Sequence, residues 1–122
     1  MNTKKIKQYS GMLALLAGTA VLSACGTAPQ TLYQWEGYQP QVYSYLKSDG
    51  ADAQKQIDAM ELGLQKIEAK GNMPPPGYHA HLGLLYASAG KPDQMVQELQ
   101  TEKKLFPESA AYMDFLLAKL KK

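Results

Sequence analysis

Few residues in this chain have side chains suited to covalent or metal chemistry: one cysteine, Cys25, and two histidines, His79 and His81. A thiol is the nucleophile that most readily accepts a covalent group. Cys25 follows Ser23 and Ala24, two small residues that allow an extended backbone to fit a narrow protease site. Because Cys25 is the only cysteine, no disulfide can form within one chain. Cys25 is therefore the candidate for covalent modification.

The segment before Cys25 has the three parts of a secretory signal. Lys4, Lys5 and Lys7 form a positive head, residues 11–22 are an apolar run, and small residues follow. The apolar run of about 12 residues is shorter than the roughly 20 residues that span a bilayer as a helix. We therefore expect residues 1–24 to be an export signal that is removed.

Residues 22–25 read Leu-Ser-Ala-Cys, which resembles the lipobox of bacterial lipoproteins. The resemblance implies that the Cys25 thiol takes a diacylglyceryl group and that cleavage falls between Ala24 and Cys25. Two or more acyl chains hold a protein firmly on a membrane. The following residue is Gly26 rather than aspartate, which resembles lipoproteins sent to the periplasmic face of the outer membrane. The alternative is an ordinary signal peptide that leaves a free cysteine.

The expected organisation has three parts: the signal at 1–24, a lipidated cysteine with a tether and an aromatic arm at 25–37, and a helical domain at 38–122. The polar tether, residues 26–31, reaches roughly 20 Å when fully extended. The domain should therefore lie close to the membrane.

Charge and composition limit the classes of partner. Three of the 13 lysines lie in the signal, so the mature chain has 10 basic and 11 acidic side chains, and no arginine. Nucleic-acid-binding surfaces usually have a basic excess and bidentate arginines. We therefore expect no nucleic-acid partner. The 98 residues after the signal are enough for one small core.

Apolar spacing, glycines and prolines predict an all-α domain without strands. Asp52 is expected to cap the second helix, in which Ile57, Met60, Leu64 and Ile67 form a narrow stripe covering an arc of about 80°. The predicted helices cover residues 41–47, 52–69, 76–89, 91–106 and 109–120.

An aromatic-rich stretch precedes and enters the first helix, with Tyr33, Trp35, Tyr38, Tyr43 and Tyr45. Rings with polar tips suit a boundary between water and an apolar phase. One interpretation is contact with a partner or a membrane interface. The other, which we favour, is that this arm packs over an apolar groove of its own domain.

Residues 76–109 resemble the tetratricopeptide helix–turn–helix unit. The similarity rests on Leu82, Gly83, Tyr86, Gly90, Leu99 and Pro107. In that unit the glycine lets two helices approach closely and the tyrosine fills the space beside it. Two positions that are normally small hold Met95 and Glu102, and His79 stands where a large apolar ring is usual. The resemblance implies small antiparallel helical hairpins.

A wider resemblance covers most of the mature chain. Its runs are Tyr33-Gln34-Trp35, Pro75-Pro76-Gly77, residues 79–86, residues 102–109 and residues 113–116. They are similar to the bacterial lipoprotein family called domain of unknown function 4810, for which no activity is established. Members are often encoded beside a lipoprotein resembling the curli-secretion channel and another small lipoprotein. The resemblance therefore implies an envelope assembly and a partner such as that channel-like lipoprotein.

The sequence gives no pattern for catalysis. His79 and His81 point about 200° apart on a helix, so they cannot jointly hold one ion there. We expect His79 to be packed or hydrogen-bonded and His81 to be solvated; only an extended backbone here would allow metal binding. Acidic residues are scattered among lysines as on solvated helical faces. We expect no enzymatic activity, no cofactor and no metal.

The last predicted helix is apolar over an arc of about 200°, wider than one core needs. Either it lies between two layers of its own domain, which we favour, or one side meets another protein. Under the second interpretation the partner surface includes this helix and the groove between the third and fourth helices. The candidate partner-binding residues are Tyr86, Leu99, Phe115, Leu117 and Leu120.

Two functions remain open from the sequence. The first is a membrane-anchored periplasmic lipoprotein that acts as a non-catalytic adaptor in an envelope or secretion-related assembly. The alternative is a ligand- or metal-binding periplasmic lipoprotein that uses the two histidines and the tyrosines.

Overall fold

The computed structural model describes residues 31–48 and 52–120, within a compact unit that covers Leu32–Lys122. No strand occurs in these described ranges, which confirms the predicted all-α class. The elements are α2 (Tyr38–Ser48), α3 (Ala53–Ala69), α4 (Tyr78–Ser88), α5 (Pro92–Leu105), the short 3₁₀ helix η2 (Pro107–Ser109) and α6 (Ala110–Lys119).

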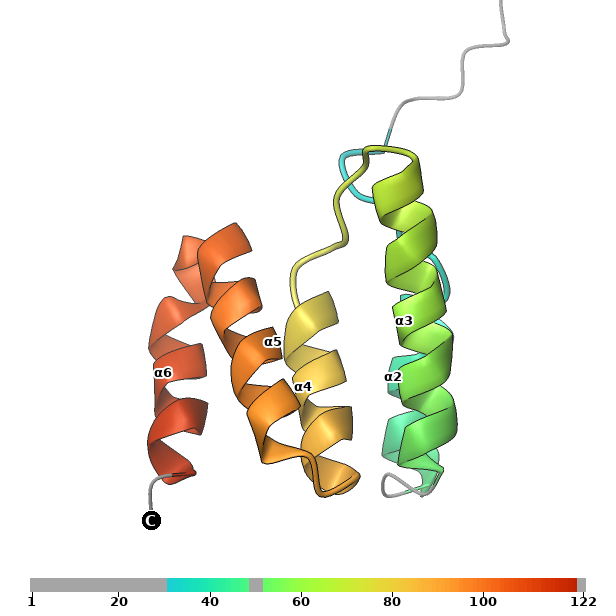
Figure 1. Ribbon diagram of the computed structural model, residues 1–122. Helices are drawn as coiled ribbons and strands as arrows, with labels where there is room; N and C mark the ends of the chain where they lie inside the picture. Colours follow the sequence, from blue (N-terminus) through green and yellow to red (C-terminus); the bar gives the residue numbers. More distant parts are fainter. Residues whose placement is uncertain (1–30, 49–51, 121–122) are drawn as a thin grey trace, which may run out of the picture. The chain divides into compact units, whose positions relative to one another are not determined.

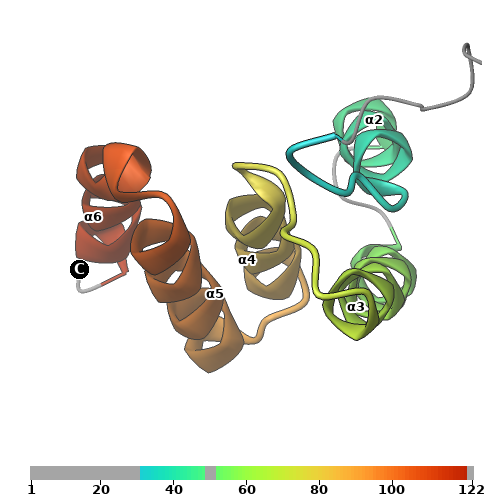
Figure 2. The same cartoon turned by 90° about the horizontal axis from the view of Figure 1, so that it is seen from above.

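Successive helices lie side by side and run antiparallel, from α3 through α4 and α5 to α6, with α2 beside α3 (Figure 1). Seen from above, α4 stands between α3 and α5, whereas α6 lies at the end of the row (Figure 2). The closest packing joins α4 to α5. Each connection therefore closes a small helical hairpin, as predicted.

The helix starts differ from the prediction chiefly at α4 and α2. α4 begins at Tyr78 rather than at 76, because Gly77 has a left-handed backbone, with φ 91°, and occupies the N-cap position. α2 begins at Tyr38 rather than at 41, because Pro40 lies in the first turn, where its missing N–H would have no partner within the helix. Asp52 occupies the N-cap position of α3 but has a left-handed backbone, with φ 59°, and its side chain makes no capping hydrogen bond. The predicted cap is thus correct in position and wrong in mechanism.

The core lies along the row of helices. The stripe on α3 is confirmed: Ile57, Met60 and Ile67 are buried, and Leu64 packs against the core at its edge. α4 is apolar on most sides and is buried against both neighbours, as expected for a helix in the middle of a row. The buried core residues are Ile57, Met60, Ile67, Tyr78, Leu82, Leu85, Tyr86, Met95, Leu99 and Met113.

The arm before α2 packs over the domain. The rings of Tyr33 and Phe106 meet edge to face with centroids 6.0 Å apart. The backbone N–H of Gln34 donates to the carbonyl of Met73 at 2.9 Å, within the connector before α4. For Tyr33, whose ring reaches the end of α5, this agrees with the interpretation that the aromatic arm packs over its own domain.

Candidate functional site

The predicted lipidation and cleavage residues, Cys25 and Ala24, lie outside the described residues, as does the whole predicted signal. Of the helices in the part that is described, none has the length and apolar character needed to cross a membrane. The candidate sites that the structure does place are on α4, α5 and α6.

Two of the predicted partner-binding residues belong to the core. Leu99 has 0% exposure, and Tyr86 is also buried. α4 and α5 pack directly on each other, and the Leu99 side chain lies against Gly83 of α4. This part of the predicted surface is wrong, because the apolar faces that looked available in the sequence satisfy each other.

The outer face of α6 carries two exposed rings. Tyr112 is 61% exposed and Phe115 is 53% exposed, and their rings stack with centroids 6.2 Å apart. The ammonium group of Lys119 lies 4.5 Å from the centre of the Phe115 ring. The inner face of α6 is anchored by Met113, the only α6 residue that is fully buried.

This arrangement decides between the two interpretations of α6. The helix packs on α5 and η2 and is the last element of the row. The favoured prediction, a helix enclosed between two layers of its own domain, is wrong. One apolar side of α6 instead faces away from the domain.

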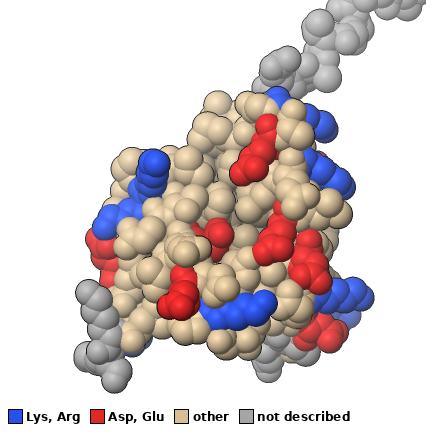
Figure 3. All heavy atoms as spheres, viewed as in Figure 1, with Lys and Arg blue, Asp and Glu red and all other residues tan. Residues whose placement is uncertain are grey.

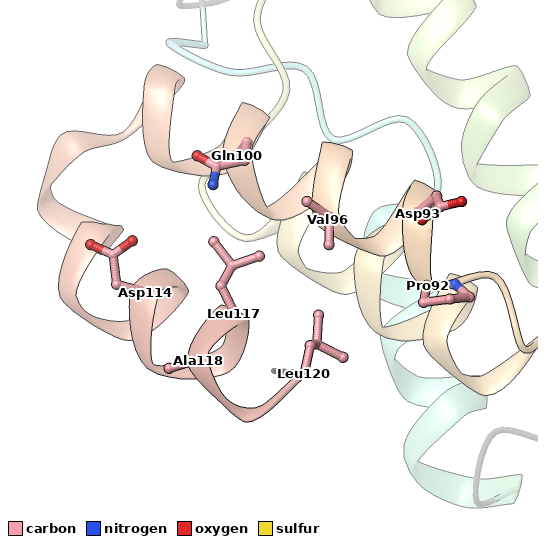
Figure 4. A pocket seen from close by; sticks show the side chains of 8 residues that line it. All are labelled: Pro92, Asp93, Val96, Gln100, Asp114, Leu117, Ala118 and Leu120. Atoms are coloured by element: carbon pink, nitrogen blue, oxygen red, sulfur yellow. The ribbon is translucent and has the colours of Figure 1, made fainter. Parts of the chain in front are cut away.

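A groove of about 560 Å³ runs between α5 and α6. Leu117 and Leu120 point from α6 toward Val96 of α5, and these three side chains form its apolar floor (Figure 4). Asp114 and Asp93 lie toward its two ends (Figure 4). Asp114 accepts a hydrogen bond from the Lys103 ammonium at 2.6 Å, so Asp93 is the acid of this groove for which no ion pair is seen among the described residues.

The two histidines of α4 face opposite neighbours, as their spacing predicts. His79 is buried and its Nδ1 lies 2.6 Å from a carboxylate oxygen of Glu98 on α5, in agreement with the expectation that it is packed or hydrogen-bonded. His81 lies against α2, with its ring edge to face with Tyr45 at 5.3 Å and with Tyr38 at 6.1 Å. The pair therefore cannot hold one ion jointly.

The expectation that His81 is solvated is wrong. Its side chain is buried, and its Nε2 has no hydrogen-bond partner. Burial lowers the pKa of His81 below its ordinary value of 6.5, and a backbone hydrogen bond with Gln41 opposes this only in part. The reason is that α2 packs across this side of α4, which the sequence of α4 alone does not reveal.

We expect the free energy of unfolding to fall as the pH drops below 6.5, the ordinary pKa of His81. Below that pH the imidazole of the unfolded chain binds a proton, whereas the buried imidazole of the folded protein stays neutral. The contribution of His81 to the free energy of unfolding is therefore fully present above that pH, and it is lost as the pH falls toward the lower pKa of the folded protein. Urea denaturation of the wild type and of His81→Phe, measured at several pH values, tests this. The variant should lose part of the acid-induced decline, and parallel pH profiles would contradict the assignment.

Glu102 is buried, whereas the sequence predicts that acidic residues lie on solvated helical faces. It is 1% exposed. Its two carboxylate oxygens accept hydrogen bonds from the backbone N–H of Gly77 at 2.6 Å and of Ala80 at 3.3 Å. These amides belong to the first turn of α4 and have no partner within the helix. A signal was present in the sequence, because Glu102 occupies a position that is small in the repeat unit it resembles.

Gly83 and Tyr86 connect α4 to its two neighbours, α5 and α3. A Cβ atom on Gly83 would lie 3.3 Å from a methyl carbon of Leu99, so the glycine permits the predicted close approach of α4 and α5. The Tyr86 hydroxyl donates to the Glu61 carboxylate of α3. Burial, together with that carboxylate, raises the pKa of Tyr86. These contacts support the helical arrangement rather than a reaction.

The face seen in Figure 1 carries lysines and carboxylates with uncharged surface between them (Figure 3). Among the residues that the structure describes, no group of three histidine, cysteine or acidic side chains is placed to hold a metal ion.

The comparisons with known proteins agree with the extent of this helical unit. The model of the family described as Domain of unknown function (DUF4810) matches residues 32–116, which include α2 to α5 and most of α6. No curated protein matches the chain, and no solved structure matches it. The matched range covers more than half of the sequence, and the chain therefore belongs to the DUF4810 family.

Proposed function

We propose that this protein is a lipid-anchored adaptor of the bacterial envelope, with a tetratricopeptide-like helical domain that binds another protein and has no catalytic role. The lipid is attached to Cys25, and the domain lies at the periplasmic face of the outer membrane. The sequence before Cys25 supports the anchor, and the unpartnered apolar side of α6 supports the adaptor role.

The single observation that carries the adaptor role is the end of the helical row. In stacked helical repeats each unit buries its apolar face against the next one. Here Tyr112 and Phe115 remain exposed where a following helix would pack, and a separate groove between α5 and α6 has an apolar floor. A helix supplied by a partner would complete the row.

The groove also indicates the chemistry of that helix. Val96, Leu117 and Leu120 require an apolar stripe. Asp93, exposed in the first turn of α5, favours a lysine or arginine at the edge of the stripe. The partner that we propose is therefore an envelope protein with a basic amphipathic helix. A lipoprotein resembling the curli-secretion channel is the candidate that the family resemblance implies.

The test is cross-linking in cells followed by affinity capture of the lipidated protein and mass spectrometry. Two substitutions outside the core, called the outer variants, test this surface: Leu120→Lys places a charge in the groove between α5 and α6, and Phe115→Lys places one on the exposed rings of α6. Each should reduce recovery of the specific partner at least about tenfold, as expected for a central apolar contact. Leu117→Lys is a less clean variant, because Leu117 also packs against the core. Circular dichroism should show unchanged helicity for the two outer variants.

The matched control is Leu62→Lys, an equivalent change of an exposed leucine on α3, outside both proposed surfaces. It should leave capture unchanged, whereas Cys25→Ser, which removes the anchor, should lose envelope partners. The adaptor proposal fails if the wild type recovers no partner above the Cys25→Ser background. The assignment to α6 fails if capture persists in both outer variants.

A further inference from the structure

We propose that the outer side of α2 rests on the membrane to which the lipid on Cys25 is attached, so that the protein is held by the lipid and by an aromatic patch. This inference rests on the anchor in the proposed function, and it is independent of the partner that binds α6.

The patch, which we call the α2 patch, consists of Trp35, Tyr43 and Leu46. These side chains are 46%, 66% and 72% exposed, respectively. Tyr43 and Leu46 border a shallow apolar depression of about 280 Å³ on the surface of α2. Trp35 joins it through Tyr38, since the two rings lie 6.0 Å apart and Tyr38 lines the depression.

The other face of α2 is already occupied. Tyr38 stacks on Tyr78 with ring centroids 5.3 Å apart, and Tyr45 packs against His81. The aromatic stretch is thus divided between two roles. Tyr38 and Tyr45 bury one face of α2 within the domain, and the α2 patch is left with no contact on its outer side in the described residues.

Composition and charge match a lipid surface. Tryptophan and tyrosine combine an apolar ring with a hydrogen-bonding tip and are favoured at the boundary between headgroups and acyl chains. α2 carries no acidic residue, and its only charged side chain, Lys47, lies 5.9 Å from the Tyr43 ring. Glu36, just before α2, is turned to an ion pair with Lys66 of α3 at 3.3 Å. An anionic bilayer therefore meets a lysine and no unpaired carboxylate there.

The length of the chain restricts where this patch can be. Six residues separate Cys25 from Leu32, and six residues span roughly 20 Å at most. A lipid on Cys25 would consequently keep the start of the helical unit within that distance of the bilayer. α2 is the first helix after the tether, so its exposed rings are the apolar surface nearest to the anchor along the chain.

Trp35 provides a direct test, because it is the only tryptophan of the chain. The lipidated full-length mature protein is reconstituted into vesicles of phosphatidylethanolamine and phosphatidylglycerol, with acyl chains that are either plain or brominated near the headgroup. Bromine quenches indole fluorescence at short range. We expect Trp35 emission to fall by roughly half in the brominated vesicles, as for a ring inserted about 5–10 Å into the interface.

Substitutions show whether the α2 patch itself contacts the membrane or whether the tether merely keeps Trp35 near it. Tyr43→Glu and Leu46→Glu should each abolish most of the quenching, because a carboxylate in the patch opposes insertion and is repelled by phosphatidylglycerol. Phe115→Glu, on α6, is the matched control and should retain the quenching of the wild type. Circular dichroism on the same samples confirms that the helices are intact.

The outcomes distinguish this inference from the proposed function. If mass spectrometry shows no lipid on Cys25 and the protein does not float with vesicles, the anchor itself is wrong. If the lipidated protein floats but Trp35 is unquenched, the α2 patch faces water or another protein, and the membrane contact is overturned. Equal quenching in the wild type and both α2 variants would also overturn it.

Discussion

Glu102→Ala is expected to lower the free energy of unfolding by about 3 kcal/mol, the largest effect of a single polar substitution in this domain. Hydrogen bonds to a charged group contribute about 1.5–3 kcal/mol, and a buried donor left without a partner costs about 1–3 kcal/mol. Here the substitution would leave the amides of Gly77 and Ala80 without their carboxylate acceptor at the first turn of α4. Urea denaturation followed by circular dichroism measures the change.

Two further variants show whether the carboxylate is responsible. Glu102→Gln keeps the shape and one acceptor oxygen, so it should cost less than the alanine variant. Glu108→Ala removes an exposed carboxylate from η2, close in sequence, and should change stability by no more than about 0.5 kcal/mol. An alanine variant as stable as the wild type would show that water replaces Glu102 at the helix end.

Gly63→Ala is expected to destabilise the protein by about 1–3 kcal/mol, the usual cost of overpacking a filled core. Helix propensity alone predicts the opposite sign, since alanine is better than glycine in a helix interior by about 1 kcal/mol. A Cβ atom on Gly63 would overlap the Tyr78 hydroxyl and would lie 2.8 Å from the backbone oxygen of Glu36. The ring of Tyr78 is fully buried and cannot move aside.

A double-mutant cycle with Tyr78→Phe tests this reason. The Tyr78 hydroxyl donates to the carbonyl of Met60 at 2.9 Å, so Tyr78→Phe alone should cost stability. Combined with Gly63→Ala it should cost less than the sum, because the hydroxyl that obstructs the new methyl group is gone. Stabilisation by Gly63→Ala alone would show that the arm and α3 separate easily at this point.

Burial of Tyr78 also raises its pKa to about 12. The phenol therefore stays protonated and keeps its hydrogen bond to Met60 in the whole range in which the other tests are made. The interface of α3 and α4 at Gly63 should for this reason show no pH dependence of its own near neutrality, which separates it from the acid sensitivity expected at His81.

Local signals in the sequence determined the helices. The stripe of Ile57, Met60 and Ile67 predicts α3 because apolar spacing of three and four follows the turn of the helix. Gly71 marks the end of α3, because glycine readily adopts the left-handed backbone that terminates a helix. Pro92 marks the start of α5, because its fixed φ suits the first turn of a helix. The resemblance of residues 22–25 to a lipobox is likewise a property of the sequence, and it implies the lipid on Cys25 on which the proposed location depends.

The tertiary structure decided which apolar and polar groups are covered. Leu99 and Leu120 look alike in a periodic pattern, yet Leu99 is enclosed by α4 and Leu120 borders an open groove. Glu102 and His81 look solvated by composition, yet helices distant in sequence enclose both. Periodicity specifies the direction of a side chain around its own helix, whereas burial depends on which neighbour packs there. That neighbour is fixed only when the whole row assembles, with α2 against α4 and α6 as the last helix of the described residues.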